Sequence, residues 1–293
     1  MLTTHTVTEE SSLRLDAYCL SIITNCTSRS QSKKWIKAGH VKVNQIVQSP
    51  AYFPKKGDVI TIAPLQSKDK PYQIPIIVHY EDDHCAVVHK PAGLHVSGNY
   101  PRTLRRALLH NLNISSVATR LAQPEPVHRL DRRTSGLLLI AKTQEAVQQL
   151  SSDFAARRIH KRYRALVLGK ATQGESQMPL NDKEAHSSWS VVQIGRSLHT
   201  EYITELEITP YTGRTHQIRR HLHNAGFPIL GDDLYHNGLV RTDKGLFLAA
   251  TQLRFSHPIN QKNIHIHINP PPKFSSFIKK ETKRYNRYHS QSS

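Results

Sequence analysis

The sequence predicts an α+β protein in which a mixed, largely antiparallel sheet with flanking helices follows a small N-terminal α/β domain. Its 293 residues are enough for two domains. Short segments of alternating apolar and polar side chains, joined by hairpin-length connections, outnumber the segments with helical periodicity. This pattern favours an antiparallel sheet over a doubly wound one. We expect a small domain at 11–64, a linker at 65–75, a body at 76–275 and a basic tail at 276–293.

The N-terminal domain is predicted to contain two helices and a small sheet. Leu15, Cys19 and Ile22 share one face of the first helix. Ser30 is placed to cap the second helix, which ends at Gly39, where a left-handed residue is favoured. Strands are expected at 41–44 and 59–62, with a turn at 54–58.

The body is predicted to alternate strands with a few helices. Thr143 is placed to cap a helix that buries Ala146, Leu150 and Phe154. Another helix is expected at 215–225, ended by Gly226. Strands are expected at 76–80, 86–89, 137–141, 161–168 and 200–208.

The chain carries a formal net charge of +18, which predicts a polyanionic partner, most often a nucleic acid. Residues 11–64 hold eight basic side chains against two acidic ones, and residues 276–293 hold five against one. The tail is expected either to grip RNA or to be a frayed, solvated end. In the N-terminal domain, the side chains expected to bind RNA are Arg29, Lys33, Lys34, Lys37 and Lys42.

What the sequence lacks excludes several classes of protein. No apolar run approaches the roughly 18 residues of a membrane span, and the first residues do not resemble a secretory signal. The three cysteines form no CxxC pair, so we expect a cytoplasmic protein without a disulfide framework. We also expect a monomer without a membrane partner. The histidines lack the spacing of a zinc site, and no glycine-rich phosphate loop occurs, so neither a metal nor a nucleotide cofactor is expected.

Three short runs combine residue types that carry chemistry. In 128–142, Asp131 stands among three arginines before an apolar strand, and these cations favour the ionised form that a nucleophile or base needs. In 211–222, a turn at Arg214 precedes a helix N-terminus, which favours anions. In 161–165, Tyr163 stands between arginines and is suited to stack on a base. Taken singly, each has a structural alternative: an Asp–Arg network, a basic helix face, or a tyrosine at a sheet edge.

Together these runs resemble a known family. KPAGLHV, HRLDRRTSGLLLIAKT, KRYRAL and TGRTHQIRRHL occur in the order and spacing of the RluA-type pseudouridine synthases, within residues 80–258. Upstream, RLD, SRSQ, IKAGHVKVN and KKGDVI are similar to the ribosomal-protein-S-four type RNA-binding domain. Two departures stand out: Arg132-Arg133 where many relatives have Lys-Asp, and Phe247–Ala250 where Leu-His-Ala is common.

The resemblance implies the pseudouridine synthase fold and a cofactor-free isomerisation of uridine in RNA to pseudouridine. Asp131 matches the essential aspartate, which attacks the anomeric carbon or assists a glycal route. Tyr163 matches the tyrosine that stacks on uracil and is implicated in removing the proton from its carbon five. Arg214 matches the arginine that pairs with the aspartate. Substrate-binding positions are implied at Arg129, which would fill the space left by the flipped uridine, and at Ile218 and Leu248 near the base.

Two further expectations concern reactivity and substrate. Arg162 and Arg164, with Arg214 across the site, are expected to favour the phenolate form of Tyr163. Large-subunit ribosomal RNA is the expected substrate, and transfer RNA is the alternative. A non-catalytic RNA-binding factor for ribosome assembly is the competing class. A glycosidic hydrolase would need two carboxylates across the scissile bond, whereas the motifs offer only Asp131.

Overall fold

The computed structural model describes residues 3–23, 26, 28–63, 71–236, 238 and 244–290. The chain divides into two compact units: residues 1–70 with 116–123, and residues 71–115 with 124–293. The expected linker lies outside the described residues as far as Lys70, and 71–75 has no regular secondary structure. In the described ranges, no helix is long and apolar enough to cross a bilayer.

In its described residues, the N-terminal unit packs two helices, α1 (Leu15–Ile22) and α2 (Arg29–Lys37), with a three-stranded antiparallel sheet. The strand order is β1 (Thr3–Thr6), β3 (Val59–Ile62), β2 (Val41–Val43). Leu15, Cys19 and Ile36 are buried against the strands. The small N-terminal α/β domain is therefore confirmed in its architecture.

Two details of this unit differ from expectation. Ser28, not Ser30, caps α2: its hydroxyl accepts a hydrogen bond from the backbone N–H of Gln31 at 3.2 Å. The sheet also begins earlier than residue 11, because β1 pairs with β3. Gly39 ends the helix as expected, with φ +76°.

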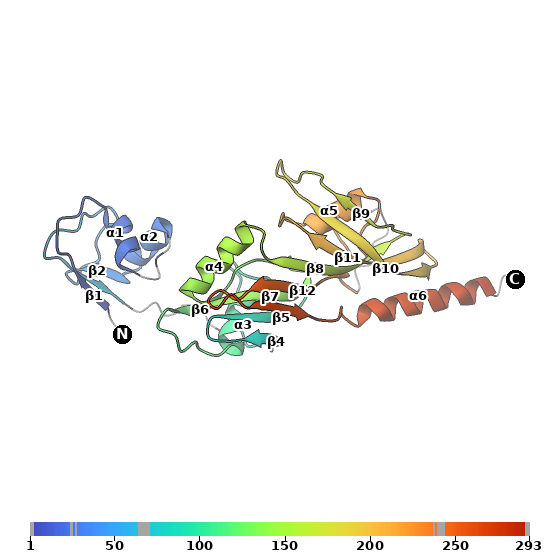
Figure 1. Ribbon diagram of the computed structural model, residues 1–293, viewed down its shortest axis with the longest axis horizontal. Coiled ribbons are helices and arrows are strands. Elements are labelled where there is room, and N and C mark those ends of the chain that lie inside the picture. Colours follow the sequence, from blue (N-terminus) through green and yellow to red (C-terminus); the bar gives the residue numbers. More distant parts are fainter. Residues whose placement is uncertain are drawn as a thin grey trace. The chain divides into compact units, whose positions relative to one another are not determined.

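The body contains one large sheet to which ten described strands belong (Figure 1). Its main path runs β4-β5-β7-β12-β8-β11-β10-β9, with β13 beside β12 and β6 beside β7. Only residues 124–126 of β6 belong to the second compact unit. Among the described pairings that have a register, only that of β7 with β12 is parallel. The strands are β4 (Val78–Glu81), β5 (Cys85–Lys90), β6 (Arg120–Pro126), β7 (Ser135–Thr143), β8 (His160–Leu168), β9 (Gly174–Ser176), β10 (Ser187–Ser197), β11 (Glu201–Pro210), β12 (Leu248–Ser256) and β13 (Asn263–His267). The mixed, largely antiparallel sheet with flanking helices is confirmed.

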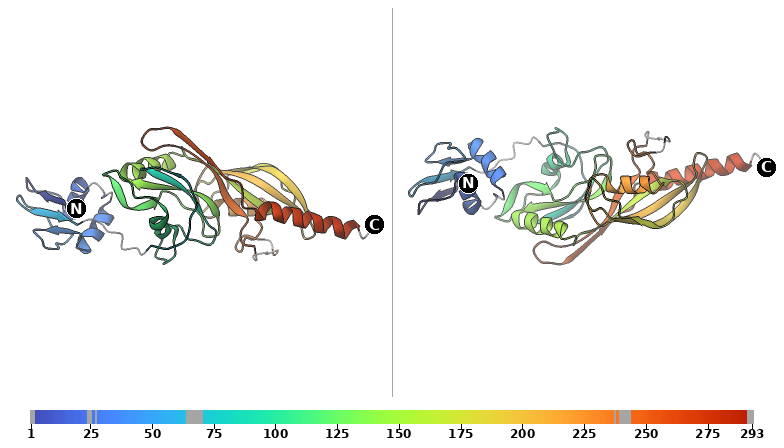
Figure 2. Two further views of the ribbon diagram at one scale, coloured as in Figure 1. Left: turned by 90° about the horizontal axis from the view of Figure 1, so that it is seen from below. Right: turned by 90° about the horizontal axis from the view of Figure 1, so that it is seen from above.

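Alternating side chains of β5 and β7 enter two cores on opposite faces of the sheet. Leu138 and Ile140 pack with α3 (Leu104–Asn111), whereas Leu137 and Leu139 pack with α4 (Gln144–Ala155). Figure 1 shows α3 and α4 on opposite sides of these strands. The hairpin of β12 and β13 extends beside α4 and adds apolar side chains to the same core (Figure 2). Because both faces are covered, β7 is buried along its whole length.

The basic tail expected at 276–293 is not a frayed end. Residues Lys273–Ser290 form the helix α6, which packs on β10. Ile278 lies so close to Gly195 that an added Cβ at that glycine would be 2.6 Å from its methyl carbon. The backbone N–H of Arg196 donates to the Thr282 hydroxyl at 3.1 Å. The expected boundary at 275 therefore falls inside a helix.

Candidate active site

All six site residues expected in the body line one cavity of about 100 Å³. They come from separate parts of the sheet and from the short helix α5 (Gln217–Asn224). The cavity is smaller than the roughly 300–1,000 Å³ of common ligand pockets, so it has room for only a small chemical group. These lining residues are Arg129, Asp131, Tyr163, Arg214, Ile218 and Leu248.

Asp131 lies in the loop between β6 and β7. The packing of the first residues of β7 against β12 positions the end of that loop. Its carbonyl oxygen accepts from the N–H of Thr134 at 3.1 Å, which closes a tight turn. Gly136 follows with φ +116°, and an added Cβ there would be 2.6 Å from the backbone nitrogen of Ala250. Only glycine permits this approach of β7 to β12. The sequence TSG thus sets the position of Asp131 through backbone packing.

Lys90 is hydrogen-bonded to the loop that carries Asp131. Its side chain is fully buried, and its ammonium donates to the carbonyl oxygens of Pro91, Leu94 and Arg132 at 2.9, 2.8 and 3.1 Å. Burial lowers the pKa of Lys90 to about 7, and the charge of Asp131 opposes this shift. Lys90 therefore connects the KPAG loop with the loop that carries Asp131.

The basic side chains nearest Asp131 are not the ones expected. Among the ion pairs of the described residues, its carboxylate lies 4.0 Å from Arg219 Nη1 and 3.9 Å from His216 Nε2. Neighbouring Arg133 turns away to pair with Asp233 and to donate to Gly231 O. Arg129 and Arg132 are exposed. The expected cluster of three arginines around Asp131 is therefore wrong in its detail.

Arg219 is held rigidly at the first turn of α5. Its Nε and Nη2 donate to the two carboxylate oxygens of Asp232 at 2.7 and 2.6 Å, and its side chain is 3% exposed. Burial alone would lower the pKa of Arg219, but the hydrogen bonds and charge of Asp232 raise it. A bidentate pair fixes the plane of the guanidinium, so the remaining Nη1 faces Asp131 from a fixed direction.

The expected pairing of Arg214 with Asp131 is wrong in this structure. Arg214 lines the cavity, but its Nε donates to the carbonyl oxygen of Glu184 at 2.8 Å. Its side chain is therefore directed toward the loop before β10. Arg219, five residues further on, has the expected place beside the carboxylate.

Buried Gln217 organises the loop that carries Arg214. Its Oε1 accepts from the Thr212 hydroxyl and the Arg214 N–H at 2.6 and 2.9 Å. Its Nε2 donates to His186 O and Ser187 Oγ, each at 2.8 Å. All the hydrogen-bonding capacity of the amide is used, which holds the end of β11 against the start of β10.

Tyr163 projects from β8 into the cavity and is 8% exposed. Burial raises its pKa well above the ordinary value, and the nearby charge of Asp131 raises it further. The flanking arginines project to the other face, where Arg162 pairs with Glu207 and Arg164 with Glu205. The expectation that arginines favour the phenolate is therefore wrong, and Tyr163 is a neutral phenol near pH 7.

Sequence reasoning missed Arg219, His216, Lys90 and Lys161 as neighbours of the site. A signal was available for two of them, because His216 and Arg219 are three residues apart and so share a helix face. His216 adopts the left-handed conformation at φ 54°, and its Nδ1 lies 3.1 Å from the Tyr235 hydroxyl. Lys161 lines the cavity from β8. Nothing local in the sequence brings Lys90 near Asp131, since 41 residues separate them.

In the N-terminal unit, the side chains expected to bind RNA lie at the surface, but not all of them are free. Arg29 and Lys33 lie 3.3 and 3.6 Å from the buried carboxylate of Asp16. Lys34 and Lys37 are exposed in the last turn of α2, and Lys42 is half-buried on β2. Two of the five cations thus also stabilise the fold.

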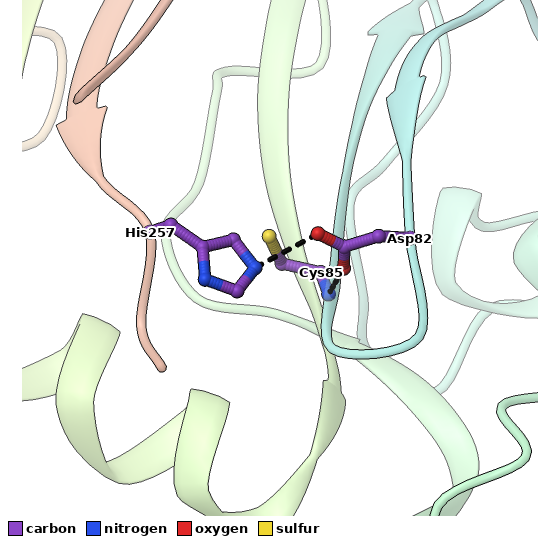
Figure 3. A group of neighbouring side chains, drawn as sticks. All are labelled: Asp82, Cys85 and His257. Carbon is purple, nitrogen blue, oxygen red and sulfur yellow. Dashed lines mark hydrogen bonds and ion pairs between the residues drawn. The ribbon is translucent and has the colours of Figure 1, made fainter. Parts of the chain in front are cut away.

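Asp82, Cys85 and His257 bring three possible metal-ligand atoms within 4.8 Å of one another (Figure 3). The carboxylate of Asp82 already accepts from the backbone N–H groups of His84 and Cys85, from Tyr80 and from His257 Nε2. His257 Nδ1 accepts from two backbone N–H groups, and burial raises the pKa of the Cys85 thiol. The donor atoms are occupied, so this cluster is a hydrogen-bonded link within the sheet.

Known proteins match both units. A family model of RNA pseudouridylate synthases matches residues 84–224, and one of S4 domains matches 13–60. The ribosomal large subunit pseudouridine synthase D of Zymomonas mobilis is 36% identical over 297 residues, covering 91% of this chain and 93% of that protein. An uncharacterized RNA pseudouridine synthase of Aquifex aeolicus is 35% identical over 278 residues, covering 85% and 88%. The solved structure of human RNA pseudouridylate synthase domain containing 1 has a TM-score of 0.55 at 24% identity over 68% of this chain and 84% of that one, which shows the shared fold.

These findings confirm the prediction made from the four motifs and from the S-four-like N-terminal segment. They also confirm the prediction of an enzyme over that of a non-catalytic RNA-binding factor. The chain belongs to the RluA-type family of RNA pseudouridine synthases, which isomerise uridine in RNA to pseudouridine.

Proposed function

We propose that this chain forms pseudouridine in large-subunit ribosomal RNA and that Asp131 is its essential carboxylate. One observation carries the role of Asp131: it is the only carboxylate among the described residues that line the 100 Å³ cavity. The substrate is supported by the name of the relative from Zymomonas mobilis, which assigns that protein to the large ribosomal subunit.

The reaction breaks the bond between N1 of uracil and C1′ of ribose and forms a bond between C5 and C1′. The proton on C5 is lost, and N1 gains one, so the reaction is redox-neutral. In its anionic form, Asp131 can bond to C1′ or take a proton from the ribose. Arg219, with Nη1 4.0 Å from its carboxylate, offsets its charge while the flipped uridine occupies the cavity, and His216 Nε2 lies 3.9 Å from the same carboxylate.

Tyr163 is proposed to stack on uracil and to take part in moving the C5 proton. It shares the cavity with Asp131 but reaches it from β8. As a neutral phenol, Tyr163 must pass on its own proton before it can accept another. Apolar Ile218 and Leu248 line the cavity and would keep the detached uracil in place.

The remaining site residues are proposed to bind the RNA chain. Arg129 is exposed at the cavity and is available to fill the space that the flipped nucleotide leaves. Arg214 is proposed as an RNA-binding residue at the cavity wall. In the N-terminal unit, the proposed phosphate contacts are Arg29, Lys33, Lys34, Lys37 and Lys42.

Pseudouridine mapping tests both parts of this proposal. Ribosomal and transfer RNA are purified from a strain that lacks the gene, incubated with enzyme, and mapped for new pseudouridines. We expect modification of large-subunit ribosomal RNA by the wild type and none by Asp131→Asn, which keeps the shape but loses the anion. Modification of transfer RNA alone would reject the substrate, and substantial turnover by Asp131→Asn would reject the role of the carboxylate.

A further inference from the structure

A second cavity, which we call the flanking cavity, adjoins the one that holds Asp131. Its volume is about 730 Å³, within the range of common ligand sites. The two cavities share a wall to which Arg129, Lys161 and Arg214 contribute. Asp131 and Tyr163 line only the small cavity. A polymer with one unit in the small cavity would therefore have its neighbouring unit within reach of the larger one.

The charged side chains that line the flanking cavity are all basic, which favours the binding of an anion. Four Lys or Arg side chains contribute to it, and no carboxylate is found among its described lining residues. Arg157 pairs with Glu184 at 2.8 Å, and Arg214 donates to a carbonyl oxygen. Lys161 has no ion-pair partner in the described part of the chain: its ammonium lies 5.6 Å from the centroid of the Phe154 ring, which leaves its charge available to a phosphate.

The same cavity offers an aromatic platform. The ring of Tyr211 stacks on the ring of His186, with centroids 4.4 Å apart and planes inclined by 28°. The Tyr211 hydroxyl lies 3.2 Å from Ser188 Oγ, and His186 Nε2 lies 3.2 Å from Glu175. The pair is thus held from both sides, yet Tyr211 remains 47% exposed. An exposed, immobilised aromatic beside a basic side chain is the arrangement that binds a nucleotide base and its phosphate.

We propose that the flanking cavity binds the nucleotide adjacent to the target uridine, with its base on Tyr211 and its phosphate near Lys161. This inference rests on the proposed function, because RNA supplies the nucleotide. Occupation of the flanking cavity would hold the substrate strand while the uridine turns into the small cavity. Tyr211 would then contribute to substrate affinity and not to the chemical step.

The first test compares Tyr211→Ala with Tyr211→Phe on large-subunit ribosomal RNA from a strain that lacks the gene. Loss of one stacked base should raise KM about 5- to 150-fold in the alanine variant. The phenylalanine variant keeps the ring and should stay within about twofold of wild type, and kcat should change little in either. Equal KM values for alanine and wild type would overturn the proposal, as would a loss confined to kcat.

The second test places a charge in the flanking cavity. Ala155 is exposed and lines it, so Ala155→Glu introduces a carboxylate facing the phosphate, whereas Ala155→Gln has the same size and no charge. We expect the glutamate variant to raise KM severalfold, less so at high salt, and the glutamine variant to resemble wild type. Equal effects of both substitutions would show that bulk, not charge, is sensed and would contradict a phosphate there.

The proposed function and the flanking cavity are tested separately. RNA affinity is also measured with Tyr211→Ala and Tyr211→Phe in an Asp131→Asn background, where no turnover is required. An inactive wild type would reject the proposed function, while these affinities would still report on the cavity. Uridine monophosphate is added as a competitor. If Tyr211→Ala weakened only that mononucleotide and left the affinity for RNA unchanged, the cavity would bind free nucleotide and the proposal would fail.

Discussion

Arg214 and Arg219, which lie near the start of α5, differ in the hydrogen-bond partners of their guanidinium groups. Arg219 is clamped by both oxygens of Asp232 and directs Nη1 at Asp131, whereas Arg214 is bonded through Nε to one carbonyl. A lysine cannot reproduce a bidentate pair, because an ammonium is a point charge on a flexible stem. The two positions therefore tolerate the same substitution differently.

We expect Arg219→Lys to reduce kcat about 100-fold or more, and Arg214→Lys to reduce it by less than about tenfold. The first substitution breaks the pair that orients Nη1 and leaves Asp232 partly unpaired in a buried site. Single-turnover pseudouridine formation by the two purified variants makes the comparison. A larger loss for Arg214→Lys would return the pairing role to Arg214.

Tyr163→Phe tests the phenol hydroxyl apart from the aromatic ring. We expect RNA affinity to be kept and the single-turnover rate to fall about 100-fold, the usual cost of losing an acid–base group. Because burial raises the pKa of Tyr163 above its ordinary value, the phenolate is a minor form between pH 7 and 9. Its population grows with pH across this window, so the wild-type rate should increase from pH 7 to 9. If the phenylalanine variant turned over at the wild-type rate, Tyr163 would serve only as a stacking surface.

Lys90 should make stability depend on pH. With a folded pKa of about 7 and an unfolded value of 10.5, the unfolded chain holds more protons between these limits. The free energy of unfolding should therefore rise with pH in that window, by at most about 1.4 kcal/mol per unit. Below pH 7, both states are protonated and the contribution is constant.

Urea unfolding at pH 6, 7, 8 and 9 gives the free energy of unfolding of the wild type and of Lys90→Met. The difference between the two at each pH is the contribution of Lys90. We expect the stability of the wild type relative to the variant to grow from pH 7 upward. A constant difference would mean that Lys90 keeps its proton throughout, as its three carbonyl acceptors favour.

At the element scale, the close approach of β7 to β12 requires glycine at position 136. We expect Gly136→Ala to destabilise the body by about 3 kcal/mol or more, because the added methyl meets the backbone of Ala250 and the positive φ is strained. Gly93→Ala is a matched control: its φ is +89°, but nothing lies within 4 Å of an added Cβ. Denaturation is followed by tryptophan fluorescence in a Trp35→Phe background, where Trp189 is the only tryptophan. Equal losses of stability would show that φ, not packing, decides.

Most strands of the body were predictable from the alternation of apolar and polar side chains, whereas β7, which is buried on both faces, was predictable as a continuous apolar run. The start of α4 was predictable too: Thr143 accepts from the N–H of Ala146 as a cap should. The parallel pairing of β7 with β12 was not, since no local pattern specifies a partner more than 100 residues away. For α6, basic residues on its exposed face concealed an apolar stripe formed by Phe274 and Ile278.

Contacts between residues far apart in the sequence also explain which part of the site could not be predicted. Motif spacing brought six residues to one cavity, but it did not distinguish Arg214 from Arg219, because both lie in the run 211–222. Which guanidinium meets Asp131 is decided by Asp232, which follows α5 and anchors Arg219. A carboxylate thirteen residues downstream is invisible to a reading of the motif alone.

At the scale of the whole molecule, we expect basic side chains of the N-terminal unit to contact RNA phosphates, so that RNA affinity falls as the salt concentration rises. We expect Lys34→Gln with Lys37→Gln to lower the slope of log affinity against log salt by about 0.7–0.9 for each RNA phosphate that the variant no longer neutralises. Lys55→Gln with Lys56→Gln removes the same charge from an exposed turn and should leave the slope unchanged. A wild-type slope for Lys34→Gln with Lys37→Gln would mean that α2 does not touch the RNA backbone.

The position of β12 has a consequence for how the protein is made. This strand is synthesised late, yet it lies between β7 and β8 and supplies Leu248 to the catalytic cavity. His257, just after β12, closes the bond to Asp82 across 175 residues. A nascent chain that ends before β12 has β7 and β8 without their central partner and a cavity without one wall. The body therefore cannot complete its fold or its cavity until β12, Leu248–Ser256, has been translated.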